Sequence, residues 1–194
     1  MLSCHVMTSI AEQRGSLTQL AVPAAIFLPL AAGLSAWAAG GMPVARLCGL
    51  IAAGLLIWTL VEYLVHRILF HLESGSPMVQ RMVYLYHGRH HDHPSDTRRL
   101  TMSLAFTLPV AALFYGLFWL LAGFLAAAPL FAGLALGYLA YETVHYLVHT
   151  GQLRGWGLMR QLRRYHLGHH YRDDTVAYGV TTPLWDFVFG SRRR

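Results

Sequence analysis

Hydrophobic residues gather in four long stretches of the chain, at roughly 20–40, 44–64, 102–124 and 129–149. Each stretch is about as long as the ~20-residue helix that crosses a hydrocarbon core ~30 Å thick. Only the short break near Ala127–Pro129 separates the last two, and we expect the turn of a tight helical hairpin there. The pattern predicts an all-α integral membrane protein with four transmembrane helices.

Two more polar segments, 66–100 and 151–190, follow the second and the fourth apolar stretch. Because each follows an even-numbered span, both should lie on the same side of the membrane. We expect them to fold together into a cap on that side. The chain from 1 to 194 is then a single membrane domain.

Composition and charge add the orientation of this domain. Only 12% of the residues are charged and 55% are hydrophobic, whereas about a quarter are charged in ordinary soluble domains. If the amino terminus is cytoplasmic, Arg46 is the only arginine of fifteen left outside, so the positive-inside rule predicts both termini and the cap in the cytoplasm. Topology then explains the net charge of +6, and we expect no nucleic-acid partner. The absence of lysine favours a bacterial source, and so a bacterial inner membrane.

Histidine changes this picture, because the chain has twelve and ten of them fall into four clusters. Each cluster lies at, or just beyond, the cytoplasmic end of the second or the fourth span. The clusters are His66 and His71 (H-x4-H), His87, His90 and His91 (H-x-x-H-H), His145 and His149 (H-x3-H), and His166, His169 and His170 (H-x-x-H-H). His5 and His93 fall outside the spacing, and we expect neither to bind metal.

The spacings are typical of metal ligands on helices. Residues three and four apart share one helix face, so each H-x-x-H-H should point up to three imidazoles in one direction. His66 and His71 would lie about 140° apart around a regular helix. They can share one target only if the helix distorts or ends near Phe70, and the segment Glu73–Pro77 carries strong helix-breaking residues.

Ten imidazoles exceed the needs of one ion, because structural zinc takes four ligands and six-coordinate iron takes six. We therefore expect two metal ions with about five histidines each. Imidazole suits both iron and zinc, so ligand type leaves the metal open. An all-histidine dimetal centre beside a bilayer suggests O₂ chemistry on a chain embedded in the membrane.

A histidine that binds metal through one nitrogen needs an acceptor that orients its other nitrogen. Carboxylates that follow or precede the clusters are candidates for this role. They are Glu62, Glu142, Asp173 and Asp174. Each could instead pair with an arginine such as Arg67.

Four segments resemble the fatty acid hydroxylase / sterol desaturase superfamily, and within it most closely the fatty acid 2-hydroxylases. They are LIWTLVEYLVHRILFH (56–71), YHGRHHDHPSDTRRL (86–100), GYLAYETVHYLVHTG (137–151) and YHLGHHYRDDTVAYGVTTPLWDFVFGS (165–191). The histidine boxes carry the resemblance to the superfamily. Pro94, Asp96 and Arg99, which follow the first H-x-x-H-H, favour the 2-hydroxylases.

This resemblance implies two iron ions held by the ten histidines, with zinc as an occupant in purified protein. It also implies O₂ as co-substrate and the 2-hydroxylation of a membrane lipid or fatty acyl chain. Many eukaryotic members carry a fused cytochrome b5 domain, for which these 194 residues leave no room. We therefore expect a separate electron donor, of cytochrome b5 or ferredoxin type.

Two other functions stay open at this point. One is a carotenoid or sterol-type hydroxylase or desaturase of the same superfamily, and the other is a membrane metal- or haem-binding protein without enzymatic activity. The basic stretch with Arg160, Arg163, Arg164 and Arg172 also has two interpretations. It could dock an acidic electron donor, or it could reflect topology and contact with lipid phosphate.

Overall fold

The computed structural model describes the backbone of residues 3–152 and 155–192, and side chains from Gln19 onward within those ranges. Throughout this described part the regular structure is helical. Four long helices carry the apolar stretches, and they are α1 (Ser3–Ala39), α2 (Val44–Leu64), α5 (Leu104–Ala122) and α6 (Phe124–Thr150). The four candidate membrane spans are Gln19–Ala39, Val44–Phe70, Thr97–Ala122 and Phe124–Thr150. The prediction of an all-α, multi-pass membrane protein is confirmed.

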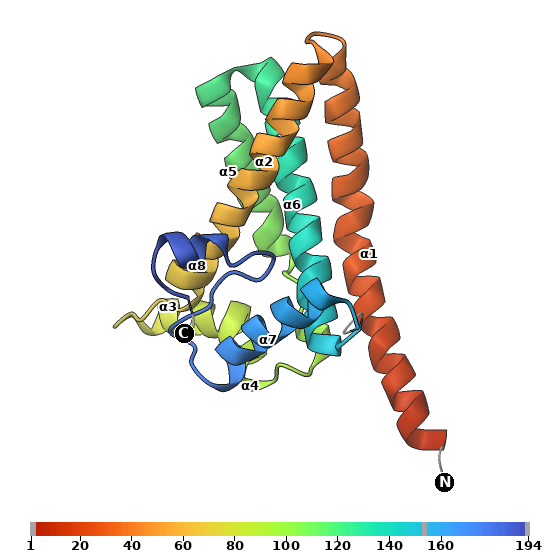
Figure 1. Cartoon of the computed structure of the whole chain (residues 1–194), viewed down its shortest axis with the longest axis vertical. Helices are drawn as coiled ribbons and strands as arrows, with labels where there is room; N and C mark the ends of the chain where they lie inside the picture. The colour runs from red at the N-terminus through yellow and green to blue at the C-terminus, as the bar shows by residue number, and fades with distance from the viewer. Residues whose placement is uncertain (1–2, 153–154, 193–194) are drawn as a thin grey trace. The chain divides into compact units, whose positions relative to one another are not determined.

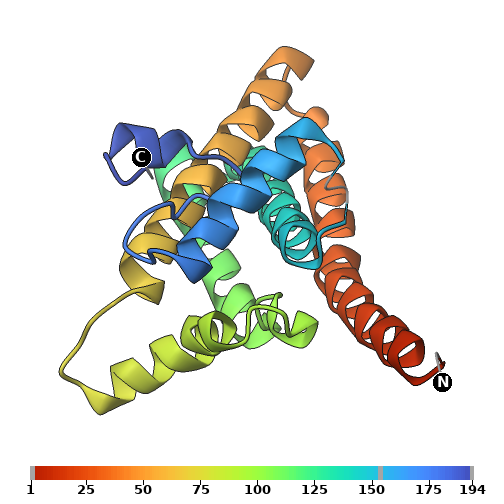
Figure 2. The ribbon, with the colours of Figure 1, turned by 60° about the horizontal axis from the view of Figure 1, so that its bottom comes forward.

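Shorter elements follow the second and fourth spans. The π-helix η1 (Val65–Phe70) continues α2, and α3 (Pro77–Val83), the π-helix η2 (Tyr84–Gly88), α4 (Arg89–Asp92) and the 3₁₀ turn η3 (Thr97–Arg99) come after it. After α6 come α7 (Gly157–Tyr171) and α8 (Leu184–Val188). Figure 2 shows α7 in blue and the segment from α3 to α4 in yellow-green as two separate helical arms.

The hairpin between α5 and α6 turns earlier than the sequence pattern predicts. The turn lies at Gly123 rather than near Ala127–Pro129, and α6 starts at Phe124 instead of about 129. Gly123 has a φ of +80°, a conformation that only glycine adopts without strain. Pro129 lies inside α6, buried, so the helix continues through a proline that removes one of its backbone hydrogen bonds.

The chain forms two compact units. Unit 2 comprises residues 22–61 and 102–140, and it holds the apolar parts of the four long helices, which are labelled in Figure 1. Small residues allow close packing in this unit: a Cβ added at Gly54 of α2 would overlap the backbone at Leu130 and Gly133 of α6. Such close contacts between glycines are typical of helix pairs in membranes.

Unit 1 comprises residues 1–21, 62–101 and 141–194. The segments 66–100 and 151–190, which the sequence predicts to fold together, both lie in it. They are joined there by the last turns of α6 and by the start of the chain. Every one of the ten clustered histidines therefore belongs to this unit. The prediction that the whole chain is a single domain stays a prediction.

Candidate metal centre

Unit 1 brings the ten clustered histidines into two groups of five. Within each group the nitrogen atoms that could bind an ion lie within 4.8 Å of one another. The first group is His66, His71, His87, His91 and His169, and the second is His90, His145, His149, His166 and His170. His93 is exposed and belongs to neither group, whereas the side chain of His5 lies outside the described residues.

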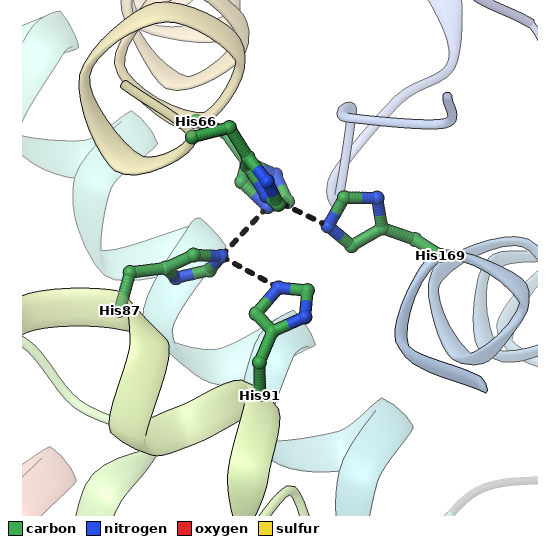
Figure 3. Close-up of side chains that lie close together, drawn as sticks. His66, His87, His91 and His169 are labelled. Carbon is green, nitrogen blue, oxygen red and sulfur yellow. Dashed lines mark hydrogen bonds between the residues drawn. The ribbon is translucent and has the colours of Figure 1, made fainter. Parts of the chain in front are cut away.

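Nε2 atoms converge in the first group. The Nε2 of His87 lies 3.1 Å from that of His66 and 2.8 Å from that of His91. His71 and His169 meet at 3.1 Å in the same way. Figure 3 shows rings from three separate segments of the chain pointing at a common centre.

The second group has the same construction. The Nε2 of His166 lies 2.9 Å from that of His149 and 3.0 Å from that of His170. His90 and His145 complete it, with their Nε2 atoms 3.1 Å apart. The first group thus takes four rings from residues 66–91 and its fifth ring from His169. The second group takes four rings from residues 145–170 and its fifth ring from His90.

A π-helical turn explains how His66 and His71 reach the same group. A π-helix bonds residue i to residue i+5, so side chains five apart lie close to one above the other. The turn η1 covers Val65–Phe70, and His71 leaves the helical conformation with φ −106° and ψ 24°. Both conditions set by the sequence, distortion and an end near Phe70, are met.

Each H-x-x-H-H is divided between the two groups, contrary to the expectation of three rings in one direction. In the first motif, His87 and His91 belong to the first group and His90 to the second. In the second motif, His166 and His170 belong to the second group and His169 to the first. The reason is geometric, because consecutive residues on a helix point about 100° apart. The middle histidine therefore turns away from the histidine that follows it.

Backbone carbonyl groups orient rings in three of the clusters. The Nδ1–H of His66 donates to the carbonyl of Tyr178 (2.5 Å), that of His145 to Leu100 (2.9 Å) and that of His169 to Val176 (2.8 Å). A neutral imidazole that donates from Nδ1 has a bare lone pair at Nε2. In each of these rings the bare Nε2 points into the group, which is the arrangement that a metal ion requires.

Among the carboxylates expected to orient these rings, Glu62 acts indirectly, through a backbone segment that contacts a ring. Glu62 is buried, and its oxygens accept hydrogen bonds from the backbone N–H of Val180 (2.6 Å) and from the N–H and hydroxyl of Thr181. It therefore holds the segment whose Tyr178 carbonyl binds His66. Glu142 is buried in α6 one turn before His145, and its role toward that ring stays a prediction.

A second buried carboxylate, which the sequence does not single out as a site residue, holds the same segment. Asp186 accepts from the backbone N–H of Tyr178 (2.9 Å) and Gly179 (2.8 Å) and from the hydroxyl of Ser191 (2.8 Å). The segment before Tyr178 contains Ala177 with a φ of +63°. Two carboxylates thus fix a strained loop that supplies an acceptor for a ring of the first group.

The two aspartates after His170 are exposed. Asp173 accepts hydrogen bonds from the backbone N–H and the hydroxyl of Thr175, which closes a local turn. Both Asp173 and Asp174 favour the charged form of His169 through space, and Asp174 does the same for His71. Their influence on the first group is therefore electrostatic.

Burial keeps the rings in their neutral, metal-binding form. It lowers the pKa of His71 to about 4 and, together with the charge of neighbouring rings, the pKa of His91 to about 3. Burial likewise holds the pKa values of His87, His90 and His166 well below the usual range. A ligating histidine must be deprotonated, so on donor chemistry the residues fit two metal ions.

Comparison with known proteins agrees with this geometry. A family model described as fatty acid hydroxylase matches residues 51–191, a range that contains all ten histidines. A dihydroceramide fatty acyl 2-hydroxylase of Arabidopsis thaliana, FAH2, is 38% identical over 158 residues, which are 81% of this chain and 66% of that protein. A fatty acid 2-hydroxylase of Rattus norvegicus is 37% identical over 150 residues, 76% of this chain and 40% of that one.

A solved structure of full-length scs7p, in which only the hydroxylase domain is visible, is also similar. It superposes with a TM-score of 0.85 and 34% identity, and the match covers 90% of this chain and 67% of the other. The chain therefore spans about two thirds of the plant relative and of this structure, and about two fifths of the rat relative.

Proposed function

Because the chain belongs to the fatty acid hydroxylase family, we propose that it hydroxylates the acyl chain of a membrane lipid, at carbon 2. The pair of five-histidine groups is the observation that carries this proposal. The position of the hydroxyl group rests on relatives that are named 2-hydroxylases. No described feature favours a carotenoid or sterol substrate over an acyl chain.

The proposed cofactors are two iron ions, one in each group, with O₂ as co-substrate; zinc could occupy the same sites in purified protein. The bound metals supply the redox chemistry that activates O₂ and oxidises a C–H bond. All ten clustered histidines are the proposed ligands. The carbonyls of Leu100, Val176 and Tyr178 fix the tautomer of their rings, so each presents a lone pair without rearrangement.

Burial of the innermost rings shields much of this centre from water. His166 and His169 are fully buried and His90 is nearly so, so the rings resist protonation. The overall reaction takes O₂, two electrons and two protons and leaves the alcohol and water. We propose that a separate protein of cytochrome b5 or ferredoxin type supplies the electrons one at a time.

The proposed location is the bacterial inner membrane, with both termini and the histidines of unit 1 in the cytoplasm. The distribution of arginine supports this orientation, because Arg46, at the start of the second candidate span, is the only arginine expected on the outer side and the other fourteen are expected on the cytoplasmic side. An electron donor in the cytoplasm could then reach the centre directly.

Expression of the chain in a bacterial host that makes no 2-hydroxy lipids tests the function. We expect total lipids, hydrolysed and analysed by mass spectrometry, to contain 2-hydroxy acyl chains. His90→Ala should abolish them, because it removes a proposed ligand. His93→Ala is the matched control and should leave them unchanged, because His93 is exposed and belongs to neither group.

Two results would contradict the proposal. One is oxygenated carotenoid with unmodified acyl chains in a host that makes both. The other is a Soret absorption band of haem in the purified protein, which would point to a haem-binding protein without this chemistry.

A further inference from the structure

Helix α7 carries a second set of polar residues that the metal centre does not use. Its histidines are buried or half-buried, whereas Arg160, Arg164 and Arg172 are exposed. These arginines line a hollow of about 550 Å³, which we call the arginine hollow. The remaining lining residues are Arg163, Leu167, Gly168 and Tyr171.

Among the residues that the structure describes, no ion pair neutralises the three exposed arginines of the arginine hollow. In the described part of the chain, the ion pairs are those of Asp96 with Arg98 and Arg99, and none involves the three exposed arginines. Cations that share one hollow repel one another, so their arrangement favours an anion between them. Guanidinium groups bind phosphate through two parallel hydrogen bonds, which makes phosphate a preferred anion.

The fourth arginine fixes the position of the hollow relative to the end of α6. The guanidinium of Arg163 donates to the carbonyls of Val148 and His149, which belong to the last turn of the candidate span Phe124–Thr150. A helix of 27 residues is about 40 Å long. That length equals a hydrocarbon core together with its headgroup layers, ~40–45 Å, so the last turn reaches the level of the headgroups.

The start of α7 has the side chains of a membrane-interface anchor. Trp156, which caps the helix, and Leu158 in its first turn are 70% and 69% exposed. Tryptophan is enriched at the level of lipid headgroups, where its apolar ring and its N–H are both satisfied. These two residues precede Arg160 within one helical turn, so apolar and cationic side chains are adjacent there.

We propose that the arginine hollow binds the phosphate group of an anionic phospholipid, with Arg160, Arg164 and Arg172 as the ligands. A lipid fits better than an acidic protein for two reasons. The site is concave and admits one headgroup, and exposed apolar side chains beside it suit an acyl chain. The proposal is independent of the hydroxylase function, because it concerns binding alone.

The test uses the purified full-length protein in detergent and measures lipid retained on it by native mass spectrometry. Phosphatidylglycerol is the anionic probe and phosphatidylcholine the neutral reference. We expect the wild type to prefer phosphatidylglycerol, and Arg160→Gln/Arg164→Gln to lose about 25-fold in affinity for it. This figure follows from roughly fivefold for each arginine near an anionic membrane surface.

Arg46→Gln/Arg81→Gln is the matched control, since it removes two exposed arginines outside the hollow. It should retain the preference, and Arg160→Lys/Arg164→Lys should restore part of it by keeping the charge. Circular dichroism and bound metal verify that every variant is folded.

Three outcomes would overturn the proposal. The first is equal loss of phosphatidylglycerol in the hollow variant and in the control, which would mean attraction by net charge alone. The second is displacement of the lipid by inorganic phosphate at equal concentration, which would mean a site for free phosphate. The third is an unchanged lipid preference in the hollow variant together with weaker binding of an acidic electron-donor protein, which would mean a docking surface.

Discussion

Individual backbone carbonyls decide how the rings of the metal centre point. The carbonyls of Leu100, Val176 and Tyr178 each accept from an Nδ1–H, and none of these is a residue whose side chain suggests such a role. Buried polar groups that orient a ligand contribute about 10–100-fold to metal affinity. Residues that place these carbonyls are therefore positioning residues for the metal.

Asp186→Asn tests this at the first group. An amide nitrogen would replace one oxygen that now accepts from Tyr178 or Gly179, so an N–H would face an N–H and the loop would shift. We expect the ion of the first group to be held about 10–100-fold more weakly, and the second group to keep its ion. Metal per chain, measured during titration with a chelator, gives the affinities.

Asp173→Asn makes the same chemical change at an exposed aspartate that accepts hydrogen bonds from the backbone N–H and the hydroxyl of Thr175. Because it removes only a charge that acts on His169 through space, it should weaken the first site much less than Asp186→Asn does and leave the second site unchanged. If the two variants release metal alike, Asp186 does not act through the loop.

The geometry of the helices decides how the histidines are divided between the two groups. The π-helix η1 aligns His66 with His71, and η2 contains His87 directly before α4 supplies His90 and His91. Because the last two are consecutive, their rings diverge and enter different groups. The short helix α4 (Arg89–Asp92) therefore supplies one histidine to each of the two proposed ion sites.

Paired substitutions can show this sharing. His90→Ala/His91→Ala removes one ligand from each group, whereas His90→Ala/His166→Ala removes two from the second and none from the first. We expect a chelator to strip both ions quickly from the former variant. From the latter it should strip one ion quickly and the other at the wild-type rate. Identical release from the two variants would contradict the assignment of His90 and His91 to different ions.

Across the whole molecule, the centre concentrates neutral imidazoles that resist protonation when folded. In the metal-free protein the pKa of His71 is about 4 and that of His91 about 3, against an ordinary value of 6.5. Because the folded values are the lower ones, the unfolded chain binds more protons below pH 6.5. Stability from these groups is complete above pH 6.5 and declines as the pH falls toward 4.

We therefore expect the chelator-treated protein to unfold at a lower temperature at pH 5.5 than at pH 7.5. The metal-loaded protein should unfold at a higher temperature than the chelator-treated protein at both pH values, because an ion that binds only the folded state stabilises that state. Thermal unfolding followed by circular dichroism measures all four conditions. A metal-free protein with the same midpoint at both pH values would contradict the depressed pKa values.

The pattern of side chains along the sequence predicts much of this architecture. Features that depend on the local geometry of the backbone are not predicted. Apolar periods locate the four spans, and histidine spacing identifies all ten rings that the structure brings together. The turn at Gly123 is missed because Pro129 is the more obvious helix breaker. The carbonyl acceptors are missed because every residue carries a carbonyl, so nothing in the sequence distinguishes Tyr178 from its neighbours.

Each group contains one histidine from the part of the sequence that supplies most of the other group. This affects when each site obtains its last ligand during synthesis of the chain. The first group lacks a ring until His169 has been synthesised, and the second until His170 has been added directly after it. Both come after all four candidate spans, the last of which ends at Thr150. Neither site can therefore have its full set of ligands before the spans have been translated, and the last ligands of the two sites are consecutive residues.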